Sequence, residues 1–387
     1  LLGHPDPPEL VDLCFTAAAG RRHFDHRVAC LAGSHAELRE QWAACSAGES
    51  SAWPIQGKAA RGGPPKIGVV FSENAHRVIA EDFCRLRQLP QLAKALDECE
   101  AAILRRTGLG LPQGLSGREA ATDATHALNP KLLSFAVDYS LGKQWLAWVG
   151  QPAILAGLGD GEVTAACVAG QISLNDAVRM LANDECWATG DERPQLGKGT
   201  SLTWSAASGC DLEQAWGTPR SPDELSAPPA DCCATLKTAV SNLVAMVRLG
   251  TVASPREVRD DHDSDLQLFY ATTDQSGSWQ RFMSLLSSVY VMGTNVDWKL
   301  VFVGTKRRVS LPTYPFQKKP FWLEPVALGI DHLPAPAPSK EDHSQRILVA
   351  DDPTALIYER QVLCTDTAAF ESCCRKLIEE AASSLSL

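Results

Sequence analysis

One short stretch of the chain has the local pattern of a site at the edge of a sheet. Residues 152–156 form an apolar run, a glycine-rich turn follows, and residues 163–170 have a helical pattern. Strand, glycine-rich turn and helix is the arrangement of an α/β sheet, whose ligands bind at the carboxyl ends of the strands. The turn reads Gly157-Leu158-Gly159-Asp160-Gly161. Asp160 is therefore the one ionisable side chain of the turn, and no residue of the turn offers a hydroxyl or a thiol.

Three other groups of residues suggest metal or phosphate chemistry but lack its full pattern. The acidic loop of Asp260, Asp261, His262, Asp263 and Asp265 has no glycine at the sixth place and no closing glutamate, so it is not an EF-hand. The glycines at 108–110 and 197–199 do not complete a phosphate-binding loop. The cysteine doublets at 232–233 and 373–374 have no histidine at ligand spacing. We therefore expect no metal and no cofactor.

Composition narrows the class of protein. The chain has 387 residues, and 46 acidic residues against 36 basic ones give a net charge of −10. A negative chain does not suit general binding to nucleic acids or anionic membranes, and no apolar run reaches the ~18 residues of a membrane span. Most of the 13 cysteines lie singly in apolar runs, as small hydrophobes do, which favours a reduced, cytoplasmic protein. The start, with neither an initiator methionine nor a signal peptide, suggests a segment of something longer.

Hydrophobic spacing predicts alternating helices and strands, and hence an α/β fold. A Ser-, Gly- and Pro-rich stretch over 46–66 is expected to be a loop, and residues 184–230 change to a Gly-, Ser-, Pro- and acid-rich composition. The expected helices are 9–20, 36–47, one through 92–103, 131–150, 163–170, 236–247, one ending at 285–290, and 368–385. The expected strands are 24–31, 67–71 and 152–156, with 356–359 as a weaker candidate.

Three stretches resemble one family, the acyltransferase region of modular polyketide synthases with its flanking linkers. The first, residues 10–27, is similar to the linker that joins a ketosynthase to its acyltransferase. The second, residues 157–179, is similar to the nucleophile elbow, its helix and the helix that follows. The third, Val296-Asp297-Trp298 with the run RRVSLPTYPFQ over 307–317, resembles the linker after the acyltransferase and is the most specific.

The resemblance implies a small α/β linker domain and an α/β-hydrolase-like acyltransferase core. We expect the linker domain over 1–66, the core over 67–285, the post-acyltransferase linker over 286–325, a Pro-rich linker over 326–345 and the start of a following region over 346–387. The core is predicted to lack most of the family's ferredoxin-like subdomain, with residues 184–230 reconnecting the ends.

The resemblance also implies a reaction that this sequence is not equipped to perform. The family places a serine in the frame G-x-S-x-G, where a sharp turn exposes the hydroxyl. Here the serine position is Gly159 and the preceding histidine position is Leu158. Glycine offers no nucleophile, so no acyl-enzyme can form there. Asp160 is a poor substitute because one step along the turn aims its side chain differently; we expect it to be solvated or to cap the helix.

Three further losses point in the same direction. The arginine that pairs with the malonyl carboxylate in the family corresponds to Asp184, and Arg179 matches another position and is expected to be a surface residue. The turn that helps to form the oxyanion hole reads Ser72-Glu73-Asn74-Ala75-His76, which puts a negative charge at that position. No stretch like the family's catalytic histidine motif occurs between 190 and 285, where His262 is the only histidine.

The sequence therefore favours a non-catalytic pseudo-acyltransferase, a scaffold within an acyl-transferring polyketide synthase. Its expected partners are the ketosynthase and other domains of the same synthase, with an acyl carrier protein or a free-standing acyltransferase as docking partners. A basic group in the post-acyltransferase linker is the candidate docking surface for an acidic carrier protein: Arg307, Arg308, Lys318 and Lys319. Two alternatives remain open: a remodelled acyl-thioester hydrolase or decarboxylase, and an adaptor for an adjacent tailoring domain.

Overall fold

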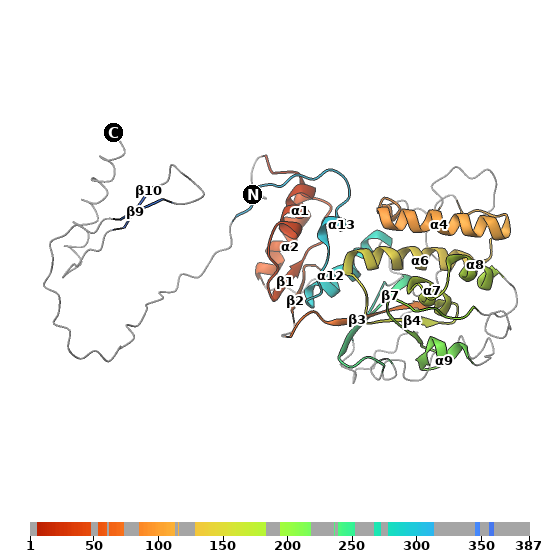
Figure 1. Ribbon diagram of the computed structural model, residues 1–387. Coiled ribbons are helices and arrows are strands. Elements are labelled where there is room, and N and C mark those ends of the chain that lie inside the picture. Colours follow the sequence, from red (N-terminus) through yellow and green to blue (C-terminus); the bar gives the residue numbers. More distant parts are fainter. Residues whose placement is uncertain are drawn as a thin grey trace, which may run out of the picture. The chain divides into compact units, whose positions relative to one another are not determined.

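The computed structural model of the chain forms two compact units, Leu1–Thr313 and Tyr314–Leu387 (Figure 1). It describes residues 6–47, 53–59, 62–72, 85–112, 115, 128–182, 194–217, 236, 239–251, 267–271, 278–312, 345–348 and 356–359. No helix among them is long and apolar enough to cross a membrane.

The first unit begins with a small N-terminal body, residues 6–47 and 53–59. Helix α1 (Leu10–Ala19) ends at Gly20, as its spacing predicts, and strand β1 (His26–Ala29) and helix α2 (His35–Ala47) follow. Strand β2 (Ile55–Lys58) pairs antiparallel with β1, so the expected loop over 46–66 contains a strand. Short edge strands of mixed polarity lack a strong alternating signal, which explains the wrong prediction.

A six-stranded sheet forms the centre of the first unit, in the order β6-β5-β4-β3-β7-β8. The central strands β3 (Lys66–Ser72), β4 (Ile154–Leu158) and β7 (Leu243–Thr251) are parallel, and β5 (Leu202–Ser205) and β8 (Gln267–Ala271) extend them in parallel. The two-residue strand β6 (Cys210–Asp211) is antiparallel to β5. The predicted α/β architecture is confirmed at this level.

Strand β7 corrects one prediction. Leu236, Val240, Leu243, Val244 and Val247 fit a helical period, but the chain is extended from Leu243 onwards. β7 is bonded to β3 on one side and β8 on the other, and neighbouring residues bury against opposite faces of the sheet. A strand buried on both faces is apolar throughout, and periodicity alone does not separate it from a buried helix.

Helices cover the sheet and bury its larger core. These are α4 (Pro90–Thr107), α6 (Pro130–Val149), α7 (Gly161–Val168), α8 (Leu174–Ala182) and α12 (Ser278–Val291). Their apolar side chains form one cluster with Val69, Phe71 and Val247 of the sheet, while Ile154, Ala156 and Met246 belong to a smaller cluster with Leu236 and Val240. Figure 1 shows α4 and α6 on one side of the strands and the short helix α9 (Leu212–Trp216) on the other.

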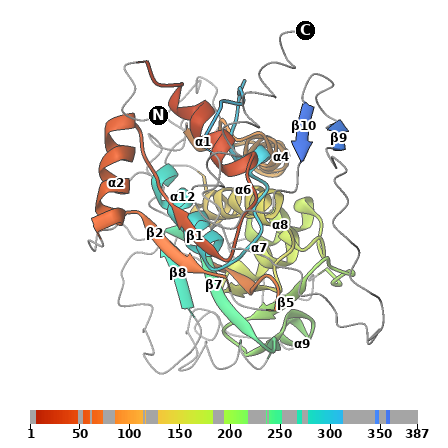
Figure 2. The same cartoon turned by 90° about the vertical axis from the view of Figure 1, so that its left-hand side faces the viewer.

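The chain after α12 returns to the N-terminal body. Figure 2 shows β1 and β2 beside α12, and Val291 of that helix lies so close to Gly57 of β2 that a Cβ there would come within 2.6 Å of its carbonyl oxygen. Helix α13 (Trp298–Val301) is capped by Asp297, whose Oδ1 accepts from the Lys299 amide at 3.0 Å. The Asp297 amide in turn donates to the Trp148 carbonyl at 2.7 Å, which connects this segment to helix α6 of the core.

The second unit is described only as a two-stranded antiparallel sheet. Strands β9 (Gln345–Leu348) and β10 (Leu356–Glu359) pair with Leu356 opposite Leu348. The weak strand prediction at 356–359 is thus confirmed. The expected helix over 368–385 lies outside the described residues.

Candidate functional site

The candidate site is the elbow, residues 157–161, where β4 turns into α7. Strand β4 ends at Leu158 and α7 begins at Gly161, so the chain reverses within two residues. Gly159 takes the turn with φ +59° and is buried. That left-handed conformation is unfavourable for most side chains, and a glycine adopts it without strain. The turn therefore has a sharp bend with no side chain at its centre.

Gly157 permits the strand and the helix to approach each other closely. A Cβ at this position would lie 2.3 Å from both the backbone nitrogen and the Cα of Glu162. These are backbone atoms that cannot rotate away, so only glycine fits. Two of the three glycines of the elbow thus have separate roles: Gly157 permits the close approach, and Gly159 adopts the left-handed turn.

Asp160 faces a lysine rather than solvent. Its Oδ2 lies 3.6 Å from Nζ of Lys131, at the start of α6, and its side chain is only 16% exposed. The carboxylate makes no capping hydrogen bond to the first turn of α7. The expectation of a solvated or capping residue is therefore wrong, because the ion pair holds the carboxylate against α6.

Directly after the elbow, Glu162 is fully buried and hydrogen-bonded to two elements. The Ser205 hydroxyl on β5 donates to its Oε1, and the Trp216 indole of α9 donates to its Oε2 at 3.0 Å. Nothing in the sequence pattern connects Glu162 with Ser205 or Trp216. A buried carboxylate needs such donors, since an unpaired one costs several kcal/mol. Glu162 thus fixes the first turn of α7 against β5 and α9.

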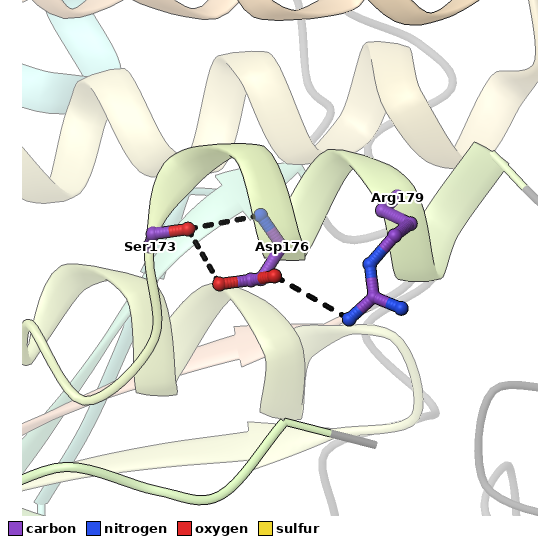
Figure 3. Close-up of polar contacts among 3 residues, drawn as sticks. All are labelled: Ser173, Asp176 and Arg179. Atoms are coloured by element: carbon purple, nitrogen blue, oxygen red, sulfur yellow. Dashed lines mark hydrogen bonds and ion pairs between the residues drawn. The ribbon is translucent and has the colours of Figure 1, made fainter. Parts of the chain in front are cut away.

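Arg179 belongs to a local network on α8 (Figure 3). Ser173 caps the helix: its hydroxyl donates to Asp176 Oδ2 at 2.6 Å and accepts from the Asp176 amide at 3.1 Å. Asp176 Oδ1 lies 3.3 Å from Arg179, one turn further on. The side chains of this pair are about one third exposed, which agrees with the expected surface arginine.

Sequence reasoning missed a buried acid in α6. Asp138 is 2% exposed, and burial raises its pKa to about 8 although the Arg248 charge acts in the opposite direction. An aspartate in the middle of an apolar helix was the available signal. The carboxyl is therefore largely neutral at pH 7 and can donate a hydrogen bond.

Several predicted residues are not part of the described chain. They are Glu73, Asn74, Ala75, His76, Asp184, the acidic loop at 260–265, Lys318 and Lys319. The described histidines, His23, His26 and His35, all lie in the N-terminal body. Among the residues that the structure describes, no group of three or more His, Cys, Asp or Glu side chains is arranged to hold a metal.

Arg307 and Arg308 come after α13 in the sequence, in a segment that lies alongside α1. The Arg307 amide donates to Asp12 Oδ1 at 2.7 Å, and the Val309 amide donates to the Thr16 hydroxyl at 3.0 Å. Arg21, beyond the end of α1, donates to the carbonyls of Leu311 and Pro312. Because the backbone makes these contacts, the side chains of Arg307 and Arg308 are left exposed.

Comparison with known proteins gives matches of three kinds. A family profile described as "CurL-like, PKS C-terminal" matches residues 2–42. The chain is 33% identical over 178 residues to erythronolide synthase EryA3 of Saccharopolyspora erythraea, covering 46% of this chain and 6% of the relative. It is 27% identical over 345 residues to the spectinabilin polyketide synthase system protein NorC of Streptomyces orinoci, covering 85% of this chain and 15% of that one. The chain thus spans a small part of these relatives.

Solved structures agree on the fold. The acyltransferase domain of ZmaA superposes with a TM-score of 0.63 at 17% identity, covering 79% of this chain and 92% of that one. The acyltransferase domain from the second module of the salinomycin polyketide synthase superposes with a TM-score of 0.56 at 19% identity, covering 80% and 93%. The chain therefore has the acyltransferase-domain fold, and its sequence is similar to segments of polyketide synthases.

Proposed function

Because an acyltransferase fold and the sequence of a polyketide-synthase segment occur together here, we propose that the chain is a non-catalytic acyltransferase-like scaffold. It would hold neighbouring domains of a polyketide synthase in place without loading an acyl group. One observation carries the proposal: the residue at the centre of the elbow is Gly159, buried and at φ +59°. Acyl transfer through an elbow needs a nucleophilic side chain at that place.

The ionisable groups around the elbow do not compensate for the missing nucleophile. Asp160 is held by Lys131, and Glu162 accepts hydrogen bonds from Ser205 and Trp216. Both carboxylates are thus engaged in contacts within the fold. The described histidines belong to the N-terminal body, so the described part of the core supplies no imidazole base for this elbow.

The spacing of α8 and β5 supports the loss of the ferredoxin-like subdomain. Helix α8 ends at Ala182 and β5 begins at Leu202, already within the main sheet. A ferredoxin-like unit has four strands and two helices. At about 5 residues per strand and about 11 per helix, it needs roughly twice the length of the connection over 183–201. A core without this subdomain lacks one wall of the substrate cleft.

Hydrogen bonds that connect the N-terminal body, the core and the segment after α12 support a role in spacing the neighbouring domains. Arg27 of β1 donates to the carbonyls of Tyr290 and Thr294, at 3.0 and 2.7 Å, and Trp148 of α6 donates to the Leu300 carbonyl at 3.1 Å. These bonds connect the N-terminal body, the core and the segment after α12. In the proposed function they set the distance between the domains before and after this region.

The basic segment after α13 is the proposed docking surface for an acidic carrier protein. The side chains of Arg307 and Arg308 are exposed, and Lys306 lies 5.5 Å from the ring centroid of Phe15. Charge reversal, Arg307→Glu with Arg308→Glu, is expected to abolish salt-sensitive binding of the carrier protein of the same synthase, measured by titration calorimetry. The same double substitution to lysine keeps the charge and serves as the control.

Covalent loading tests the main proposal. The full chain is incubated with malonyl- or acetyl-coenzyme A, and its intact mass is measured beside that of an acyltransferase domain with the elbow serine. We expect the mass of this chain to stay unchanged while the control gains one acyl group. A stable acyl adduct on this chain would overturn the scaffold proposal.

The two other functions predict different results. A remodelled acyl-thioester hydrolase or decarboxylase would consume acyl thioesters. Its turnover would fall in Asp160→Asn or His76→Ala if either residue replaced the missing nucleophile or base. An adaptor would cross-link to a tailoring domain as well as to its covalent neighbours. Cross-links confined to those neighbours favour the passive spacer.

A further inference from the structure

The inner face of α6 carries polar atoms that the fold leaves without partners. Four polar side chains of the helix are buried: Ser134, Asp138, Ser140 and Gln144. The Ser140 hydroxyl donates to the Ala136 carbonyl at 2.6 Å, and Gln144 Oε1 accepts from the Leu92 amide at 3.1 Å. In the described part of the chain, Ser134 Oγ and Asp138 Oδ1 have no hydrogen-bond partner.

These two atoms share one face of the helix. Residues four apart lie one above the other, so Ser134 and Asp138 lie on the face that continues to Gly142. A Cβ on Gly142 would come within 3.0 Å of Phe71 Cζ and 3.2 Å of Val168 Cγ2, which places this face against β3 and α7. At the start of the same face, Lys131 reaches Asp160 of the elbow. The unpartnered atoms therefore lie between the elbow and the end of β3.

Native proteins rarely leave such atoms unpaired. An unsatisfied buried polar group is destabilising because it has lost its hydrogen bonds to water, and the large majority of buried side-chain polar atoms have a partner, either protein or ordered water. A buried water usually makes about 3 hydrogen bonds to groups of this kind. A serine hydroxyl and a neutral carboxyl, one helical turn apart, offer both donors and acceptors to one water molecule.

We propose that Ser134 and Asp138 bind one internal water molecule between α6 and the elbow edge of the sheet. The ligand is a small neutral molecule able to donate and to accept, and the site is built from two side chains that are more than nine-tenths buried. The water supplies the hydrogen bonds that the protein groups do not. The site is independent of acyl chemistry, so its test does not depend on the scaffold proposal.

Infrared spectroscopy tests the site in solution. The C=O stretch of a protonated carboxylic acid falls in frequency when its oxygen accepts a hydrogen bond, and a buried acid with its pKa near 8 shows this band at pH 6. In the full chain we expect the band of a hydrogen-bonded acid, identified by its disappearance in Asp138→Asn. Ser134→Ala removes one partner of the water, so the band should move towards the frequency of a free acid.

Ser140→Ala is the matched control, because that hydroxyl bonds within its own helix and its loss should leave the band in place. If Asp138→Asn does not fold, the difference between the wild-type and Ser134→Ala spectra still reports the shift. A crystal structure of the full chain should contain density for a water within hydrogen-bond distance of Ser134 Oγ and Asp138 Oδ1. A band at the free-acid frequency that ignores Ser134→Ala, or an empty position in the crystal, would overturn the proposal.

Discussion

The imidazole of His23 stacks on the indole of Trp298, with ring centroids 6.4 Å apart and planes inclined by 22°. His23 follows α1 in the N-terminal body, whereas Trp298 opens α13 after the core. Tyr290 of α12 closes the group: its hydroxyl lies 2.6 Å from His23 Nδ1, and its ring meets Trp298 edge to face. Two stretches that resemble the family's linkers, residues 10–27 and 296–298, therefore meet in one aromatic cluster.

The protonation of His23 makes this cluster sensitive to pH. Its Nε2 lies 2.8 Å from the Ala18 carbonyl, which can only accept, so Nε2 carries the proton and Nδ1 of the neutral ring accepts from Tyr290. Burial, with a contribution from the Arg27 charge, lowers the pKa of His23 below 6.5. The unfolded chain then binds the proton more tightly than the folded one, so stability falls as pH drops below about 6.5.

We predict that His23→Gln flattens this part of the stability curve. The measurement is the urea midpoint between pH 5 and 8 for the wild type and the variant. His26→Gln is the matched control, because His26 is exposed on β1 and is not one of the three rings of the cluster. An identical pH dependence in wild type and His23→Gln would contradict the assignment.

Trp216→Phe should weaken the attachment of α9 to the elbow. The substitution keeps an aromatic ring but deletes the indole N–H that donates to Glu162 Oε2, and a lost bond to a charged acceptor costs about 1.5–3 kcal/mol. Chemical denaturation of the full chain measures the loss. Trp42→Phe, on an indole that is 45% exposed, should change the free energy of unfolding by less than about 0.5 kcal/mol. Equal effects of the two substitutions would argue against the Glu162 network.

The sequence was sufficient for elements whose pattern is local. The helices α1, α2, α4 and α6 and the strands β3 and β4 follow from apolar spacing and from glycine or proline at their ends, such as Gly20 after α1 and Pro130 at the start of α6. The apolar spacing of β7 predicts a helix, wrongly, because both faces of the strand are buried and it has no polar alternation. Its identity is set by its neighbours in the sheet rather than by its own period.

The candidate site likewise has one part that a local sequence pattern predicts and another part that only the fold brings together. The elbow and its missing side chain are visible in five consecutive residues, 157–161. The partners of Glu162 are not, since Ser205 and Trp216 come from a stretch whose composition resembles a loop and are brought together only by the fold. The Lys131–Asp160 pair depends on the packing of α6 against the elbow and likewise has no local signal.

Gly157→Ala should destabilise the core more than an ordinary glycine substitution. The added methyl would overlap the backbone of Glu162 at 2.3 Å, and overpacking of this kind costs about 1–3 kcal/mol or more. Gly33→Ala is the control, because its Cβ would meet only a side-chain oxygen of Glu37 at 3.7 Å. Thermal unfolding of both variants should give a clear drop in Tm for Gly157→Ala alone. Similar Tm values would mean that strand and helix are not in close contact at the elbow.

Ser173→Ala and Arg179→Ala separate the helix cap from the ion pair on α8. The serine hydroxyl satisfies the Asp176 amide, and loss of such a cap costs about 1 kcal/mol. The Arg179–Asp176 pair is partly exposed, and pairs three or four residues apart on a helix contribute only about 0.2–0.5 kcal/mol. Urea denaturation should therefore show the larger loss for Ser173→Ala. A larger loss for Arg179→Ala than for Ser173→Ala would contradict this ranking of the cap above the ion pair.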